Sequence, residues 1–242
     1  MFRKTAPASR YGFLISIYTM FIDWLIVDGD CGPCQYSAYS MSTENNNRRR
    51  PYRLKARADQ QALTRQRITK AVVELHETAG PAGTTVSEVA ERAGVGRVTV
   101  YKHFPTEADL FRACSAHWAA EHPPPDFSDC AKIRDPEQRT RCVLGRLYPY
   151  FREAHPMMSR ILRDAPLLPA LQDILDNGWF PIMRQLGRIL VPGGLNASSR
   201  RRAHAAASVI LDLRTWENLT GTGLDDAAAA EVAAKMYAGI LD

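Results

Sequence analysis

The stretch that decides the fold is TVSEVAERAGVGRVTVYKHF, residues 85–104. Thr85 and Glu88 have the spacing of a capping box, in which a hydroxyl and a carboxylate satisfy backbone amides at the start of a helix. Gly94 is expected to end that helix, because glycine takes the left-handed backbone conformation at little cost. A second helix is expected to start near Gly96 and to end at Phe104, since the residue before a proline disfavours helical geometry. The stretch therefore predicts a helix, a tight turn and a second helix.

Helical patterns continue on both sides of residues 85–104. A preceding helix is predicted from apolar residues at helical spacing, namely Ile68, Val72, Leu75 and Ala79. Thr106 is expected to cap a following helix, and a loop is expected from Pro123 to Pro136. Further helices are expected at about 137–154, 156–163, 167–190, 198–220 and 226–240. No segment alternates apolar and polar residues as a strand does, so the fold class is predicted to be all-α.

Charge is distributed unevenly along the chain. The 242 residues carry 31 Lys+Arg and 26 Asp+Glu, and 45% of them are hydrophobic, which excludes a wholly disordered or fibrous protein. Residues 41–104 hold 12 basic against 6 acidic side chains, whereas residues 105–242 hold 16 against 17. A basic segment attached to a near-neutral remainder is typical of a head that binds a polyanion.

The second helix of the motif offers side chains suited to reading DNA. A helix-turn-helix lays its second helix in the major groove, where side chains near its N-terminus reach the base edges. If Val95, Val100 and Phe104 are buried, the exposed residues are Arg97, Val98, Thr99, Tyr101, Lys102 and His103. Arginine can pair with guanine, valine can touch a thymine methyl, and the remaining side chains can bind bases or phosphates. We also expect Thr85 and Ser87, at the N-terminus of the first helix, to contact phosphates.

Residues 84–95, TTVSEVAERAGV, and 99–105, TVYKHFP, resemble the TetR/AcrR family of transcriptional regulators. The resemblance implies a homodimer with a three-helix DNA-binding domain, placed here at 58–104, and a regulatory and dimerisation domain at 105–242. It also implies a repressor that a small-molecule effector releases from a palindromic operator, and a dimer formed by helices 198–220 and 226–240. Gly96 and Glu107 depart from the family, which usually has a polar residue and a phosphate-binding lysine there.

The first 57 residues are predicted to be an N-terminal extension that ends in a basic arm. Arg48, Arg49, Arg50 and Arg53 are expected to contact the DNA backbone. Translation starting at Met41 would remove most of the extension. An alternative hypothesis is a membrane-tethered regulator, because residues 11–27 are largely apolar, although they are shorter than an ordinary span and contain Asp23.

Enzymatic and metal-dependent functions find little support in the sequence. Cys31 and Cys34 have the spacing of a thiol redox motif, which remains a weaker alternative because no strand pattern precedes them. Five cysteines in a chain of this length do not predict a disulfide framework, and no Cys/His grouping has zinc spacing. We therefore expect a cytoplasmic protein that is not an enzyme and has no cofactor or metal. The residues expected to line an effector cavity are Tyr148, Phe151, Met158, Trp179 and Met183.

Overall fold

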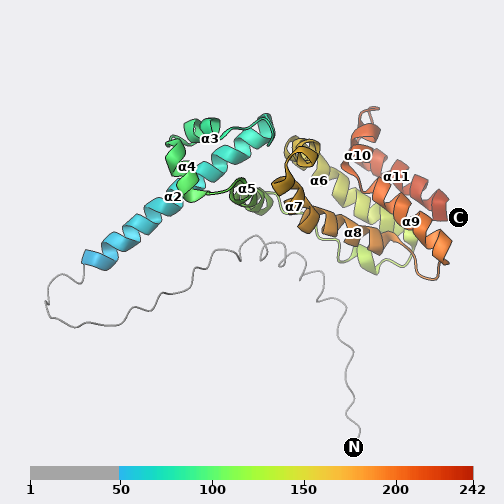
Figure 1. Ribbon diagram of the computed structural model, residues 1–242. Helices are drawn as coiled ribbons and strands as arrows, with labels where there is room; N and C mark the ends of the chain where they lie inside the picture. Colours follow the sequence, from blue (N-terminus) through green and yellow to red (C-terminus); the bar gives the residue numbers. More distant parts are fainter. Residues whose placement is uncertain (1–48, 242) are drawn as a thin grey trace, which may run out of the picture.

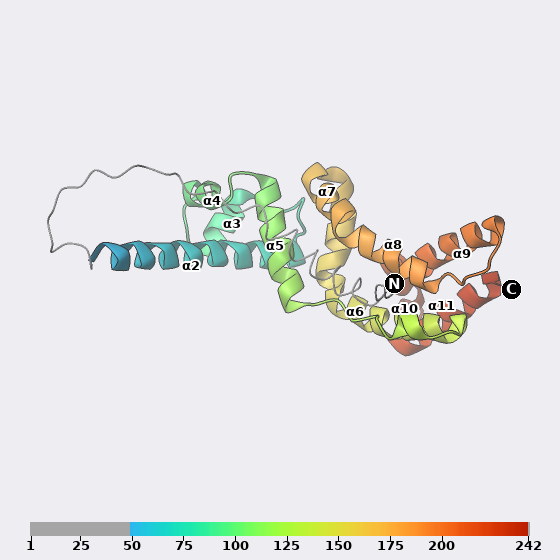
Figure 2. The same ribbon diagram turned by 90° about the horizontal axis from the view of Figure 1, so that it is seen from below.

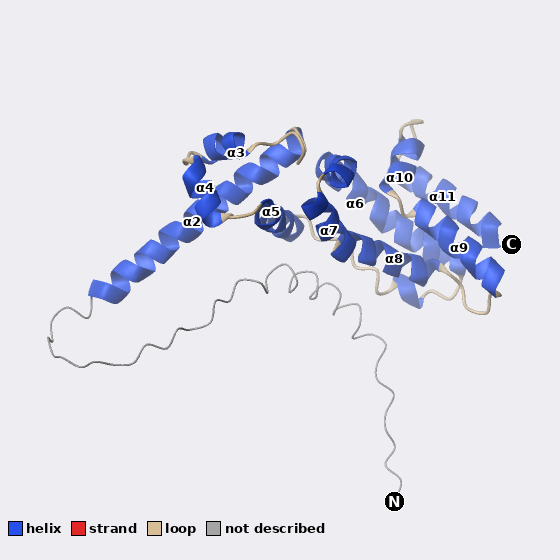
Figure 3. Cartoon of the chain, in the orientation of Figure 1, coloured by secondary structure: helices blue, strands red, loops and turns tan. Residues whose placement is uncertain are grey.

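The computed structural model describes residues 49–241, and within them every regular element is a helix (Figures 1 and 3). The α-helices are α2 (Arg49–Thr78), α3 (Val86–Ala93), α4 (Arg97–His103), α5 (Glu107–Glu121), α6 (Pro136–Asp164), α7 (Pro169–Asn177), α8 (Trp179–Leu190), α9 (Ala197–Ile210), α10 (Leu213–Thr220) and α11 (Asp226–Leu241). Two short 3-10 helices, η2 (Cys130–Lys132) and η3 (Ala165–Leu167), flank α6. The all-α prediction is confirmed. The segment 11–27, Cys31, Cys34, Met41 and Arg48 lie outside the described residues.

The head consists of α2, α3 and α4, and its core is the predicted apolar stripe of α2. Ile68 and Val72 are fully buried against α3 and α4, and Leu75 is half-buried. Ala79 is exposed, because α2 ends at Thr78 and Gly80 turns the chain with a φ of 87°. The predicted end of this helix at Gly80 is therefore correct to within two residues, but Ala79 is not part of the buried stripe.

The start of α2 differs from the prediction. The helix begins at Arg49, so Arg49, Arg50 and Arg53 belong to its first turns and not to an arm outside the helical domain. Its first turns contain Lys, Arg, Ala and Gln, which favour helix strongly. They carry little apolar periodicity, which is why the sequence pattern placed the helix start near residue 58.

The body consists of α6 to α11, in which α6 is the central helix (Figure 2). It is one continuous helix across Pro149 and Pro156, so the predicted break between 154 and 156 is wrong. Each proline removes one backbone hydrogen bond, but the residues around both prolines are held by burial in the core. They include Tyr148, Tyr150, Phe151, Met157 and Met158.

Two other predicted helices are each divided into two. The segment predicted at 167–190 forms α7 and α8, which meet at Gly178. The segment predicted at 198–220 forms α9 and α10, because the side chain of Asp212 accepts a hydrogen bond from the amide of Arg214 and caps a new helix. The sequence pattern missed both breaks because a short interruption leaves the apolar spacing on either side almost unchanged.

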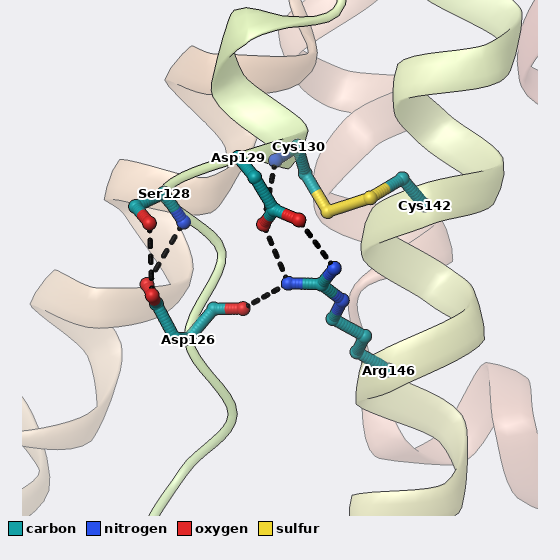
Figure 4. Close-up of a disulfide and its surroundings, with 6 residues drawn as sticks. All are labelled: Asp126, Ser128, Asp129, Cys130, Cys142 and Arg146. Carbon is teal, nitrogen blue, oxygen red and sulfur yellow. Dashed lines mark hydrogen bonds and ion pairs between the residues drawn. A yellow bond between two sulfur atoms is a disulfide. The ribbon is translucent and has the colours of Figure 1, made fainter.

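A disulfide joins η2 to the first turns of α6, contrary to the expectation from the cysteine count (Figure 4). Cys130 and Cys142 are 12 residues apart in sequence, and their Cα atoms lie 5.6 Å apart, which is within the normal range for such a bond. Beside it, Arg146 makes two hydrogen bonds to the carboxylate of Asp129, at 2.6 and 2.7 Å. This ion pair holds the pKa of Asp129 at about 2. The predicted loop 123–136 is therefore folded back and fastened to α6.

Candidate nucleic-acid interface and effector cavity

The capping box predicted for α3 is present. The hydroxyl of Thr85 accepts a hydrogen bond from the amide of Glu88 at 3.3 Å, and the carboxylate of Glu88 accepts one from the amide of Thr85 at 2.8 Å. The Thr85 hydroxyl also donates to that carboxylate, and these bonds lower the pKa of Glu88. Gly94 ends the helix with a φ of 63°, as predicted. Thr85 thus forms the N-cap of α3, while Ser87 is exposed in the first turn of the same helix.

The helix α4 presents one buried and one exposed side. Val100 and Phe104 are almost completely buried, and Val95 in the turn is half-buried. On the opposite side, the exposed residues lie at positions i, i+1, i+4 and i+5 of one helix face and are Arg97, Val98, Tyr101 and Lys102. Thr99 and His103 are half-buried at its edges.

Val98 has no role in the core, since 82% of it is exposed. Tyr101 is 48% exposed, so its ring is not confined to packing against α2. The structure therefore brings the exposed reading residues of α4 together on one accessible surface. We call this surface, made of Arg97, Val98, Tyr101 and Lys102, the α4 face.

Two arginines of α2, which no sequence pattern marks as special, hold the α4 face in place. Arg65 donates to the carbonyl of His103 at 2.5 Å, and its guanidinium lies 4.1 Å from the centre of the Phe104 ring. Arg67 donates to the carbonyls of Ala93 and Gly94 at the turn, at 2.5 and 3.1 Å. Nothing in the sequence distinguishes them from the neighbouring arginines.

The electrostatic field at the end of α4 is positive. The pKa of His103 is lowered by partial burial first, and then by the charges of Arg65 and Lys102. Such a field favours a bound anion and disfavours an additional proton on the imidazole.

The two departures from the family pattern both lie at helix starts. Gly96 is the N-cap of α4 and provides no side-chain hydrogen bond, and a Cβ atom added there would meet nothing within 4 Å. Glu107 is exposed in the first turn of α5, where a negative charge favours the helix. Thr106 and Asp109 form a capping box at the same helix start, so the prediction that Thr106 caps α5 is confirmed.

A cavity with a volume of about 700 Å³ lies between α8 and α9. Trp179 and Met183, two of the residues expected to line an effector cavity, are in its wall. Phe180, whose aromatic side chain gives the same sequence signal, lines it as well. The lining residues that the sequence pattern did not indicate are Leu162, Arg184, Gly187, Arg188, His204, Ser208, Leu211, Asp212 and Leu213. Those on α9 were missed because the helix was expected to serve the dimer only.

A second cavity, of about 70 Å³, lies between α5 and the body. Met158 and Trp179 line it together with Cys114 and Trp118 of α5. Trp179 thus borders both cavities. The volume is large enough for a few waters but not for a drug-sized ligand.

Tyr148 and Phe151 line neither cavity. Both are fully buried in the core, and the Tyr148 hydroxyl donates to the carbonyl of Ile210 at 3.0 Å. Burial raises the pKa of Tyr148. Their aromatic side chains gave the same sequence signal as a cavity wall, because both environments are apolar.

Residues 49–241 contain no cluster of three or more His, Cys, Asp or Glu side chains arranged to hold a metal ion. In the same part of the chain, no helix is both long and apolar enough to cross a membrane.

Comparison with known proteins matches residues 68–114 to the model of the bacterial regulatory proteins of the tetR family. Among solved structures, a transcriptional regulator from Rhodococcus sp. Rha1 is 23% identical, with a TM-score of 0.49, over 73% of this chain and 95% of that chain. A TetR transcription regulator from Haloarcula marismortui is 17% identical, with a TM-score of 0.46, over 74% and 96% of the two chains. None of the curated proteins matches the chain.

Proposed function

We propose that this chain, a member of the tetR family of bacterial regulatory proteins, is a DNA-binding repressor that an effector releases from a palindromic operator. The α4 face would enter the major groove. Arg97 would pair with guanine, Val98 would contact a thymine methyl, and Thr99 would bind a base or a phosphate. Tyr101, Lys102, His103, Ser87 and the amides that start α3 would bind phosphates.

The observation that carries the proposal is that the α4 face is held firmly from its inner side while its exposed side chains have no partner within residues 49–241. Among the described residues, no hydrogen bond or ion pair engages the side chains of Arg97, Tyr101 or Lys102. Buried contacts of Val100 and Phe104 hold the helix on its inner side. Arg65 holds its C-terminal end, and Arg67 holds the turn that precedes it. A rigid helix with free donors at regular spacing is suited to base-edge recognition.

A dimer would supply the two-fold symmetry of the operator. The helices α9 and α11 pack side by side and leave large apolar side chains exposed, namely Val209, Val232, Met236 and Ile240. Burying them against a second copy would form the four-helix bundle that the resemblance implies. We keep the prediction that Arg48, Arg49, Arg50 and Arg53 add contacts to the DNA backbone; the last three belong to the first turns of α2.

Contacts at the end of α6 would couple the body to the head. Arg160 donates to the carbonyl of Thr78 at 2.9 Å, and Asp164 accepts from the amide of Ala82 at 3.0 Å. Arg163 donates to the carbonyl of Ala79 and pairs with Asp164. We call these three side chains the α6 clamp.

Leu162, in the same turn of α6, lines the large cavity. An effector that moves this turn would therefore also move the clamp, and with it the head. Its action would be a shift between two head positions with different affinity for DNA.

The test is fluorescence anisotropy of DNA that flanks the gene of this chain, with an excess of unrelated duplex. We expect specific binding with a steep salt dependence. Arg97→Ala is expected to weaken it by about tenfold or more, because a bidentate guanine contact is lost. Arg134→Ala, an equal charge loss at an exposed position of the body, is the control and is expected to change little. Equal binding by Arg97→Ala and the unmodified chain would overturn the proposed role of the α4 face.

A further inference from the structure

Charged groups form one edge of the cavity between α8 and α9. Arg184 and Arg188 lie one turn apart on α8, and His204 and Ser208 lie one turn apart on α9. Asp212 follows directly after α9, as the N-cap of α10. These residues are exposed, so they form the open side of the cavity.

The basic groups of this edge have no partner. Across residues 49–241, no hydrogen bond or ion pair engages the side chains of Arg184, Arg188 or His204. The one acidic group, Asp212, is already used as the N-cap of α10, where it accepts from the amide of Arg214 at 2.8 Å. The edge thus has an excess of positive charge and several free donors.

The floor of the same cavity is apolar. Its side chains come from α6, α8 and the α9–α10 junction and are Leu162, Trp179, Phe180, Met183, Leu211 and Leu213. Gly187 lies buried in this floor, and a Cβ atom added there would meet the side chain of Leu211 at 3.9 Å, an ordinary contact. The glycine therefore leaves room that a larger side chain would occupy.

We infer that this cavity binds an amphipathic organic anion whose carboxylate lies between Arg184 and Arg188 and whose apolar body covers the floor. The volume of about 700 Å³ is typical of sites for small organic molecules. Two arginines against one acid favour a single negative charge, and guanidinium groups bind carboxylates through paired hydrogen bonds. The inference gives a chemical class to the effector, and in that respect it rests on the proposed function.

Calorimetric titration of the full chain with matched pairs of probes tests this inference. Decanoate and 2-naphthoate are compared at neutral pH with their uncharged alcohols, 1-decanol and 2-naphthalenemethanol. We expect at least one of the acids to bind more tightly than its alcohol. Failure of both acids to bind, or equal binding of each acid and its alcohol, would overturn the inference.

Two pairs of variants locate the binding. Arg184→Gln with Arg188→Gln is expected to weaken acid binding by about tenfold or more and to leave alcohol binding unchanged, since only the paired charges are lost. The control, Lys70→Gln with Arg134→Gln, removes the same charge at exposed positions outside the cavity. Equal losses in the two double variants would mean that general charge attraction causes the binding, which would contradict the inference.

Gly187→Leu is expected to abolish binding of acid and alcohol alike by filling the floor, whereas Gly187→Ala is expected to retain it. Circular dichroism checks that both variants are folded. Undiminished acid binding by a folded Gly187→Leu variant would place the ligand elsewhere, for example between two copies of the chain.

Anisotropy of the DNA complex separates this inference from the proposed function. Acid binding without any change in DNA affinity would support the ligand site and refute release by an effector. Specific DNA binding by a chain that binds neither acid would support the proposed DNA-binding function and refute the ligand class.

Discussion

His76, at the junction of the head with α5, is expected to make the stability of the protein depend on pH. The side chain is 4% exposed, its ring packs against Phe111, and its Nδ1 atom lies 3.4 Å from the sulfur of Cys114. Burial lowers its pKa from 6.5 to about 4, and the charge of Asp164 opposes this shift only in part. Burial also raises the pKa of Cys114 to about 12, with Glu77 contributing, so the thiol stays neutral.

The direction of this pH dependence follows from the lowered pKa of His76 in the folded state. Between pH 6.5 and about 4 the unfolded chain binds a proton at His76 and the folded chain does not, so stability falls as the pH falls. These two pKa values correspond to a loss of about 2 kcal/mol on going from pH 7 to pH 5. The lowered pKa values of Asp129, Asp164 and Asp226 add stability that is lost only at lower pH, below their ordinary value of 3.8.

The assay is urea unfolding of the unmodified chain and of His76→Leu at pH 7 and pH 5. Leucine cannot ionise and suits a buried apolar site, so the variant is expected to lose about 2 kcal/mol less between the two pH values. The absolute stability of the variant does not affect the result, because the free energy of unfolding at pH 5 is compared with that at pH 7 for each chain separately. The same pH dependence in both chains would refute the account of a neutral buried histidine.

Three further perturbations follow from the same contacts. Thr85→Ala is expected to lower the free energy of unfolding by about 1 kcal/mol in urea titrations by removing the cap of α3, whereas Ser87→Ala should leave it unchanged; equal losses would contradict the capping role. Replacing Cys130 and Cys142 by Ser is expected to cost about 3 kcal/mol through loss of the loop constraint. Reduction by dithiothreitol should destabilise the unmodified chain by the same amount as the double substitution does, and should leave the stability of the variant unchanged. Glu107→Lys is expected to steepen the salt dependence of DNA binding by about one phosphate contact per protomer, and an unchanged slope would place Glu107 away from the DNA.

The parts of the structure that were predictable are those fixed by local chemistry. The capping box of Thr85 and Glu88, the left-handed Gly94 and the cap at Thr106 each depend on residues within one helical turn. The buried side of α4 follows from apolar spacing alone, because Val100 and Phe104 lie one turn apart. Such signals need no knowledge of distant segments.

The features that were missed depend on long-range contacts. Arg65 and Arg67 act on residues 26 to 38 positions away, and arginines bound to carbonyls have the same sequence signal as solvated ones. Cys130 meets Cys142 only because η2 folds back on α6. Likewise, Tyr148 and Trp179 are both large aromatic residues and look alike in the sequence. Only Trp179 lines a cavity, because the cavity depends on how α8 and α9 pack against each other.

The most direct test of the account is selection from a library of random duplexes by the purified chain, with Arg97→Ala selected in parallel. The account predicts enrichment of a two-fold symmetric sequence whose half-sites are separated by about one helical turn or a multiple of it. It also predicts that Arg97→Ala no longer enriches one guanine in each half-site. Enrichment of no common sequence, or of the same sequence by both proteins, would contradict recognition of DNA through the α4 face.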